Sequence, residues 1–326
     1  RGVELLPAKA GASLLVDMIA GGVTGELIVA GRLGDFGIKP AHALLDELDM
    51  EGDAIITRRT LSLSSDPWIV DHAIDGKPVL PGVIGLELMA ATAALAVPGR
   101  VYAGASEVSF KAPVKLHGKE PTTLIMRAEP DGPDTVRCSL RSARTAKTGR
   151  VIESDHFEAV IHWSAPQISG LPAMALPDHV VDAKAIYQRF FHGPGFQVLT
   201  QATAVTADAL MADGAVQHAV ICGGLITSPL VLEAAFQAAG LHGMMTAGVM
   251  ALPEHIEQVV NLGRVREGET LKLTVRQNGE RYDVDVDGAG GPVLQLRGFK
   301  MVQAGPLPPG DKFEPPEGGW TQTVVA

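Results

Sequence analysis

Residues 67–96, PWIVDHAIDGKPVLPGVIGLELMAATAALA, constrain the fold of this chain more than any other stretch. A turn that carries His72 leads into Pro81 and Gly82, and the apolar segment at residues 83–96 predicts a helix of about four turns, buried nearly all round. The segment is too short to span a bilayer, so a buried core helix is expected. The rest of the chain must therefore supply elements that enclose this helix.

Strand patterns follow this helix, and the same order returns in the second half of the chain. The predicted strands of the first half begin at residue 54 and then occupy residues 105–110, 122–128, 135–142 and 151–163. The second half has a short helix at residues 183–191, a second apolar helix at residues 230–246, and predicted strands at residues 215–221, 255–262, 270–277, 281–287 and 293–302. Two similar helices, each preceded by a proline turn and followed by strands, indicate a duplicated α+β fold.

Turn-rich and proline-rich stretches divide the chain. The predicted segments are an N-terminal extension or remnant of an upstream domain with a linker (1–50), a first unit (51–165), a linker (166–182), a second unit (183–304) and a C-terminal linker (305–326). Within the first segment, residues 8–20 predict a helix and residues 26–30 a strand. These elements fit either the end of an upstream domain or an extension packed on the main domain.

Composition favours a folded protein and argues against several partners. Hydrophobic residues make up 46% of the 326 residues and charged residues 20%, which is ample for a buried core. The net charge of −10 comes from scattered acids, so no basic face for nucleic acid is expected. No stretch has the features of a signal peptide or a membrane span. Cys138 and Cys222 lack C-x-x-C spacing, which predicts neither a zinc site nor a disulfide framework and favours a reducing cytoplasm.

His72 is the first candidate for chemistry. Gly76 permits a positive φ, while Pro78 and Pro81 fix φ, so the turn is expected to hold the histidine in place. Directly ahead of a buried helix, its ring would face a dry cavity and the positive end of the helix, which suits a base beside a developing oxyanion. On this motif alone, a structural histidine is the alternative.

Glu233 is the second candidate, because it lies within the apolar run LVLEAAFQAAGL. An unpaired charge is costly there, so the carboxyl is expected to be paired, protonated or in a cavity; the alternative is a position at the solvent edge of the helix. Gln237 lies four residues later, on the same helix face. His192, His242 and His255 show no metal-ligand spacing with one another or with His72, so a zinc enzyme is not expected.

Three motifs carry a family resemblance. The stretch DHAIDGKPVLPG resembles the H-x-x-x-G-x-x-x-x-P motif of the dehydratase domains of type I polyketide synthases and polyunsaturated fatty acid synthases, with His72, Gly76 and Pro81 at its fixed positions. FHGPGFQ (191–197) and SPLVLEAAFQ (228–237) match two further motifs in the expected order. The resemblance implies a double hot-dog fold over residues 53–303, in which each antiparallel sheet wraps a central helix. Glu233 departs from the family, which usually has aspartate there.

The resemblance also implies roles for the motif residues. His72 would remove the α-proton of a β-hydroxyacyl thioester, Glu233 would protonate the leaving β-hydroxyl, and Gln237 would orient the carboxyl or the hydroxyl. The backbone amides near Gly82 and Val83 would hold the developing thioester oxyanion. The residues expected to shape or line the substrate site are Gly76, Pro81, Gly82, Val83, Gly193, Pro194 and Gly195.

The predicted activity is dehydration to an α,β-unsaturated thioester, without a metal or a bound cofactor. The substrate would arrive on the phosphopantetheine arm of an acyl carrier protein. This carrier and the other domains of a multidomain synthase are the expected partners, and the resemblance implies a homodimer. Two alternatives remain open: an isomerase or cyclase that uses the same pocket, and a non-catalytic structural or carrier-docking domain.

Overall fold

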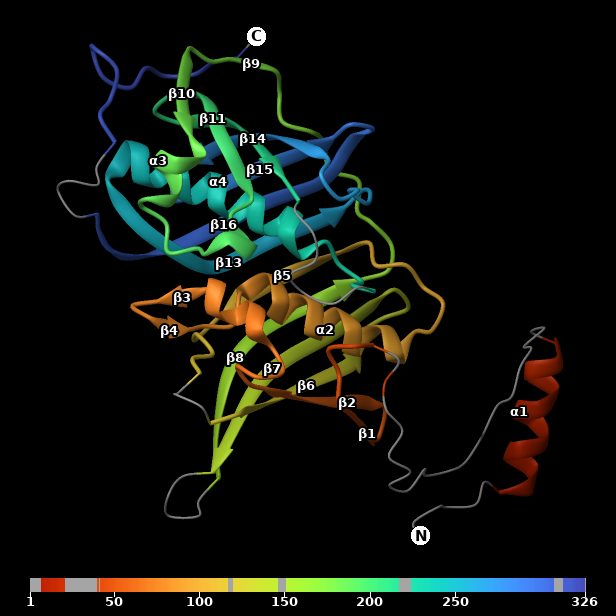
Figure 1. The fold of residues 1–326 in the computed structure, drawn as a ribbon. Helices are drawn as coiled ribbons and strands as arrows, with labels where there is room; N and C mark the ends of the chain where they lie inside the picture. The colour runs from red at the N-terminus through yellow and green to blue at the C-terminus, as the bar shows by residue number, and fades with distance from the viewer. Residues whose placement is uncertain are drawn as a thin grey trace.

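One antiparallel sheet of 13 strands dominates the computed structural model, which describes residues 7–20, 40, 42–116, 120–145, 151–216, 224–307 and 313–325 (Figure 1). The strand order is β1-β2-β6-β7-β8-β5-β13-β16-β15-β14-β12-β11-β10. The strands of the first half are β1 (Glu47–Glu51), β2 (Ala54–Leu61), β5 (Gly104–Phe110), β6 (Thr122–Pro130), β7 (Thr135–Thr145) and β8 (Val151–His162). Those of the second half are β10 (Asp178–Asp182), β11 (Leu199–Val205), β12 (Ala209–Ala215), β13 (Val249–Asn261), β14 (Thr270–Asn278), β15 (Arg281–Gly288) and β16 (Gly291–Pro306).

Each half of the sheet encloses one apolar helix. The helix α2 (Gly82–Ala96) packs on β2, β6, β7 and β8, and α4 (Pro229–Ala247) packs on β11 to β16. In both halves the strand directly after the helix lies at the junction, where β5 pairs with β13 between Ser109 and His255 and between Gly104 and Val260 (Figure 1). The order β2-β6-β7-β8-β5 is thus mirrored by β12-β14-β15-β16-β13, which confirms the double hot-dog fold.

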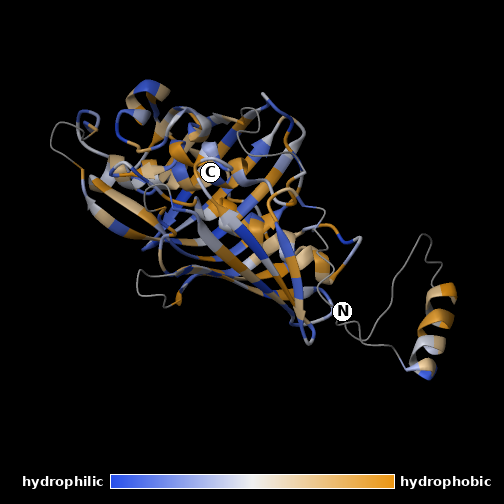
Figure 2. Ribbon diagram, turned by 60° about the horizontal axis from the view of Figure 1, so that its bottom comes forward, coloured by the Kyte–Doolittle hydropathy of each residue, from blue (hydrophilic) through white to orange (hydrophobic). Residues whose placement is uncertain are grey.

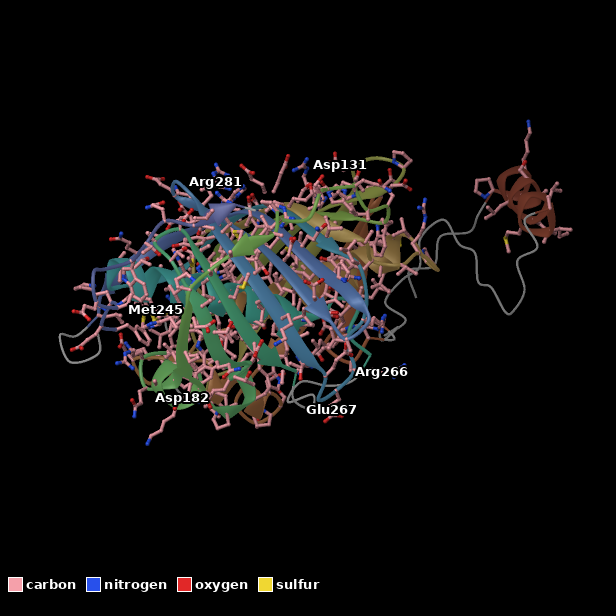
Figure 3. All side chains as sticks on the ribbon, turned by 90° about the horizontal axis from the view of Figure 1, so that it is seen from above. Asp131, Asp182, Met245, Arg266, Glu267 and Arg281 are labelled. Atoms are coloured by element: carbon pink, nitrogen blue, oxygen red, sulfur yellow. The ribbon has the colours of Figure 1, made fainter. Side chains whose placement is uncertain are left out.

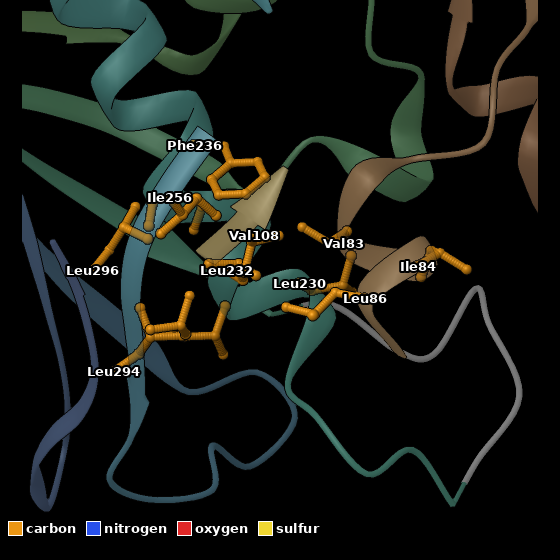
Figure 4. Packing of buried hydrophobic residues seen from close by; sticks show 14 of the residues in the cluster. Val83, Ile84, Leu86, Val108, Leu230, Leu232, Phe236, Ile256, Leu294 and Leu296 are labelled. Carbon is orange, nitrogen blue, oxygen red and sulfur yellow. The ribbon is translucent and has the colours of Figure 1, made fainter. Parts of the chain in front are cut away.

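The two helices are buried because their sequences are apolar almost throughout, as predicted. Every residue from Val83 to Ala93 of α2 is buried, and α4 is buried without a break from Pro229 to His242. Strands alternate instead, with hydrophobic and hydrophilic residues following one another along the ribbon (Figure 2). Successive side chains of a strand point to opposite faces, so the apolar ones share one face of the sheet. Figure 4 shows where the helices meet, with Val83 and Leu86 beside Leu230 and Leu232. The core of the two units is therefore continuous.

Short elements form the turn before α2 and the segment before β11. A 3₁₀ turn, η1 (Pro67–Asp71), leads into the two-residue strands β3 (Ala73–Ile74) and β4 (Lys77–Pro78) ahead of α2. In the second half, the helix α3 (Ala183–Tyr187) and the 3₁₀ turn η2 (Pro194–Phe196) precede β11. The predicted helix at residues 183–191 is thus too long, because the chain leaves the helix after Tyr187 and turns the rings of Phe190 and Phe191 toward a cavity.

Several short strands have no counterpart among the predicted elements. β10 lies in the proline-rich stretch and forms the sheet edge, and β9 (Met174–Ala175) pairs with β17 (Val324–Val325) of the C-terminal tail. Thr323 N donates to Asp208 Oδ1 at 2.9 Å, so residues 313–325 fold back on the second unit. The predicted strand at residues 26–30, most of that at residues 215–221, and Cys222 lie outside the described residues. The division into units stays a prediction.

The N-terminal helix and the charged side chains lie outside the packed cores of the two units (Figure 1, Figure 3). The helix α1 (Ala8–Ala20) has the predicted bounds, lies apart from the body in Figure 1 and exposes Leu15, Val16 and Ile19. Charged side chains such as Asp131, Asp182 and Arg281 lie at the periphery of the sheet (Figure 3). Within the described residues, no helix is long and apolar enough to cross a membrane.

Candidate active site

The turn before α2 fixes the ring of His72 and the nitrogen that it offers. His72 Nδ1 lies 2.8 Å from the carbonyl oxygen of Val79, and the amide of Val79 donates in return to the carbonyl of His72 at 2.9 Å. A carbonyl oxygen can only accept, so Nδ1 carries the proton and Nε2 of the neutral ring keeps its lone pair. Gly76 permits this tight turn with a φ of 69°. The backbone therefore holds His72 in the tautomer that a base needs.

Burial keeps this imidazole neutral. His72 is only 8% exposed, and the loss of solvation lowers its pKa to about 4. The carboxylate of Glu233 opposes this effect, and the electrostatic interaction with His192 adds to it. At neutral pH the ring is therefore unprotonated and able to accept a proton.

The start of α2 borders the same cavity as this ring. Pro81 is the N-cap residue, and Gly82 borders a cavity. A Cβ at position 82 would lie 2.7 Å from Cε1 of Phe110, which leaves no room for a side chain. The first amides of a helix have no preceding turn to accept their hydrogen bonds, so Gly82 N and Val83 N are the groups suited to an oxyanion.

The loop FHGPGF docks on the His72 turn from the second unit. Gly193 N donates to the carbonyl of Asp71 at 2.7 Å, and Gly195 N donates to Asp71 Oδ2 at 3.0 Å. A Cβ on Gly193 would collide with the side chain of Asp71. This docking makes an antiparallel bridge between His72 and His192 and brings their ring centroids to 5.3 Å.

Glu233 lies on α4 with two hydrogen-bond donors on one oxygen. His192 Nε2 lies 3.1 Å from Oε1 of Glu233, and Gln237 Nε2 donates to the same oxygen at 2.8 Å. The Gln237 amide also donates to the carbonyl of Phe196 at 2.7 Å and accepts from Tyr187 Oη at 2.8 Å. Gln237 thus donates both of its amide hydrogens within the protein, one of them to the carboxyl of Glu233.

The charge state of Glu233 follows from these partners. Burial by itself would raise the pKa of Glu233, but the hydrogen bond and electrostatic interaction with His192, together with the hydrogen bond from Gln237, lower it. Glu233 is 4% exposed and borders the cavity. The carboxyl is therefore ionised at rest beside His192.

A single cavity of about 210 Å³ joins the two candidates. His72, Gly82, His192, Glu233 and Gln237 border it among apolar and aromatic side chains. The structure thus brings together the two side chains that the sequence singled out for acid and base chemistry, one from each unit. Of the residues predicted to line the site, only Gly82 borders the cavity. Gly76, Pro81, Gly193, Pro194 and Gly195 lie in the two turns beside it, and Val83 lies in the first turn of α2.

The residue that sequence reasoning missed is His192. The sequence raised it only as a possible metal ligand, whereas the structure pairs it with Glu233 at 3.1 Å. Its Nδ1 is buried and has no hydrogen-bond partner among the described residues. The signal in the sequence was its place inside the FHGPGF motif, directly before Gly193.

Comparisons with known proteins agree with this geometry. A family model described as the polyketide synthase dehydratase domain matches residues 42–143, and one described as the polyketide synthase dehydratase N-terminal domain matches residues 172–310. Together the two matches cover well over half of the chain.

Curated relatives of this chain are polyunsaturated fatty acid and polyketide synthases. The chain is 22% identical over 291 residues to a polyunsaturated fatty acid synthase protein of Thraustochytrium sp., covering 85% of this chain and 10% of that protein. It is 27% identical over 293 residues to a mycocerosic acid synthase-like polyketide synthase of Mycobacterium tuberculosis, covering 83% of this chain and 14% of that protein. The chain thus spans about a tenth of the length of these relatives.

Among solved structures, the dehydratase domain from the CurF module of the curacin polyketide synthase superposes with a TM-score of 0.67. The sequence identity is 16%, and the match covers 81% of this chain and 100% of that one. This likeness confirms the fold. The two family models show that the chain belongs to the dehydratase domains of type I polyketide synthases.

Proposed function

We propose that this domain removes water from a β-hydroxyacyl thioester, with His72 as the base and Glu233 on the acid side. The observation that carries the proposal is the meeting of a neutral imidazole and a buried carboxyl in one apolar cavity. Nε2 of His72 takes the proton from the α-carbon, and the amide of Gly82, which borders the cavity at the start of α2, stabilises the negative charge on the thioester oxygen. The double bond forms as the bond from the β-carbon to oxygen breaks.

The leaving hydroxyl needs a proton, and the sequence predicted Glu233 as its source. Because the pKa of Glu233 is lowered, the carboxyl alone does not hold that proton at rest. We propose that Glu233 and His192 hold it jointly across their 3.1 Å contact and that the carboxyl passes it to the hydroxyl. Water leaves, and the proton on His72 returns to this pair through the solvent.

The partners of the domain follow from its family. Relatives are parts of much longer synthases, which supports the other domains of a multidomain synthase as neighbours. We propose that an acyl carrier protein delivers the substrate on its phosphopantetheine arm, that no bound cofactor takes part and that the domain forms a homodimer. A cytoplasmic location is part of the same proposal.

A turnover assay with defined variants tests the reaction. β-Hydroxybutyryl pantetheine is incubated with the protein, and loss of water is followed by mass spectrometry. We expect His72→Ala and Glu233→Gln each to lower the rate by at least about a hundredfold, because each removes a proton-transfer group. His255→Ala and Glu257→Gln, which alter residues of β13 outside the cavity, serve as matched controls and should keep wild-type turnover.

The outcome also separates the alternatives. Full turnover in both site variants would contradict the site assignment. Wild-type protein that shifts a double bond or closes a ring without releasing water would favour an isomerase or a cyclase. Wild-type protein that turns over no thioester would favour a structural or carrier-docking domain.

A further inference from the structure

The cavity continues beyond the reacting side chains along one face of α4. The residues of α4 that border it are Glu233, Phe236, Gln237, Gly240 and Met244, which recur with the spacing of a single helix face. At 1.5 Å per residue, the distance along the helix from Glu233 to Met244 is about 16 Å. One wall of the cavity therefore leads away from the carboxyl for roughly three turns.

Past Gln237 the wall is apolar on both sides. The facing strands contribute residues 250–253 of β13 and Phe299, Met301 and Val302 of β16, and the two strands pair at Leu252 and Val302. Here the amide groups of a pantetheine arm would give up their hydrogen bonds to water without gaining new ones, whereas a hydrocarbon chain has no hydrogen bonds to lose. Lys111 also borders the cavity, but its ammonium group pairs with Glu158 at 2.6 Å.

Gly240 borders this part of the cavity and places no side chain in it. Glycine inside a helix is less stable than alanine, and a Cβ at position 240 would lie 3.7 Å from Cε1 and Cζ of Phe190, an ordinary contact. The fold would therefore accept alanine, yet the chain has glycine at this point of the wall. A side chain longer than alanine would have to enter the cavity beside Phe190, which also borders it.

We propose that the acyl chain of the substrate runs along this face of α4, and that Gly240 and Met244 set the length and bulk of the chain that is admitted. The substrate class is a thioester with an extended apolar acyl chain. Three methionines of the wall, Met244, Met250 and Met301, are unbranched and adapt to chains of different shape. The inference rests on the proposed dehydration, because both use the same cavity.

The first measurement is the dependence of turnover on chain length. Wild-type kcat/KM is compared for β-hydroxybutyryl, β-hydroxyoctanoyl and β-hydroxydodecanoyl pantetheine. Burial of each added methylene should raise kcat/KM about fourfold until the cavity is filled.

Two variants then shorten the cavity at different depths. Gly240→Leu should lower kcat/KM for the octanoyl and dodecanoyl substrates by at least about tenfold while the butyryl substrate keeps its rate. Met244→Phe, one helical turn farther along, should affect the dodecanoyl substrate most and the octanoyl substrate less. Glu257→Gln, which alters a residue of β13 outside the cavity, is the control and should leave the order of substrates unchanged.

The outcomes distinguish this inference from the proposed function. An active wild type whose Gly240→Leu variant stays folded and treats all three lengths alike, or loses the butyryl substrate as well, would overturn the acyl channel alone. If Gly240→Leu does not fold, an unchanged chain-length profile in Met244→Phe would overturn it. A wild type that dehydrates none of the substrates would contradict the proposed reaction itself.

Discussion

At the scale of single residues, the chemistry depends on which nitrogen His72 presents. The hydrogen bond from Nδ1 to the Val79 carbonyl, at 2.8 Å, assigns the free lone pair to Nε2. Burial removes the competing cationic form, because the pKa of His72 is lowered to about 4. The base is thus ready without a preceding deprotonation at neutral pH.

This gives a prediction for the pH dependence of the reaction. A base acts in its neutral form, which dominates above its pKa, so kcat/KM should lose activity on the acid side only as the pH approaches about 4. The measurement is the pH profile of kcat/KM with β-hydroxybutyryl pantetheine, limited to the range in which the protein stays folded by circular dichroism. An acid limb centred at the ordinary histidine value of 6.5 would contradict a buried neutral His72.

At the scale of elements, a buried carboxylate joins the two halves. Glu87 of α2 is fully buried and accepts from Ile226 N and Thr227 N at 2.8 Å each, and from the hydroxyl of Thr227. His42, in the segment before β1, lies 3.1 Å from the same carboxylate. Because residues 226–227 lead directly into α4, Glu87 fixes the approach of the second helix to the first.

Loss of this carboxylate should destabilise the whole domain. Glu87→Ala leaves two backbone N–H groups without a buried acceptor, and we expect the free energy of unfolding to fall by about 3 kcal/mol or more. Urea unfolding followed by circular dichroism measures this change. Glu129→Ala, which removes an exposed ion pair with Arg127, is the matched control and should cost less than about 1 kcal/mol. Equal effects in the two variants would contradict the role of Glu87 in linking the two halves of the domain.

The long helices could be predicted from the sequence, whereas contacts between distant segments could not. The unbroken apolar runs predicted α2 and α4 to within one residue at each end, because no surface position interrupts them. The contacts of His192 and of Glu87 were not predicted, because each depends on the folded chain. His192 reaches Glu233 across 41 residues within the second unit, and Glu87 reaches Ile226 and Thr227 across about 140 residues when the two units dock. Short pairings such as β9 with β17 depend on the folded tail and leave no periodic pattern.

At the scale of the whole molecule, the duplicated fold explains why there is one cavity between two units. The first unit supplies His72 and the start of α2, and the second supplies His192, Glu233 and the wall along α4. The pairing of β5 with β13 and the docking of Gly193 on Asp71 hold these parts in register. Neither unit contains the site by itself.

The most direct test of this account is a crystal structure of the Glu233→Gln variant with β-hydroxyoctanoyl pantetheine bound. We predict density in the cavity with the α-carbon beside Nε2 of His72, the β-hydroxyl within hydrogen-bonding distance of the side chain at position 233, and the alkyl tail along α4 toward Met244. Density for the thioester outside this cavity, or a bound thioester that contacts only one of these two side chains, would contradict the central claim.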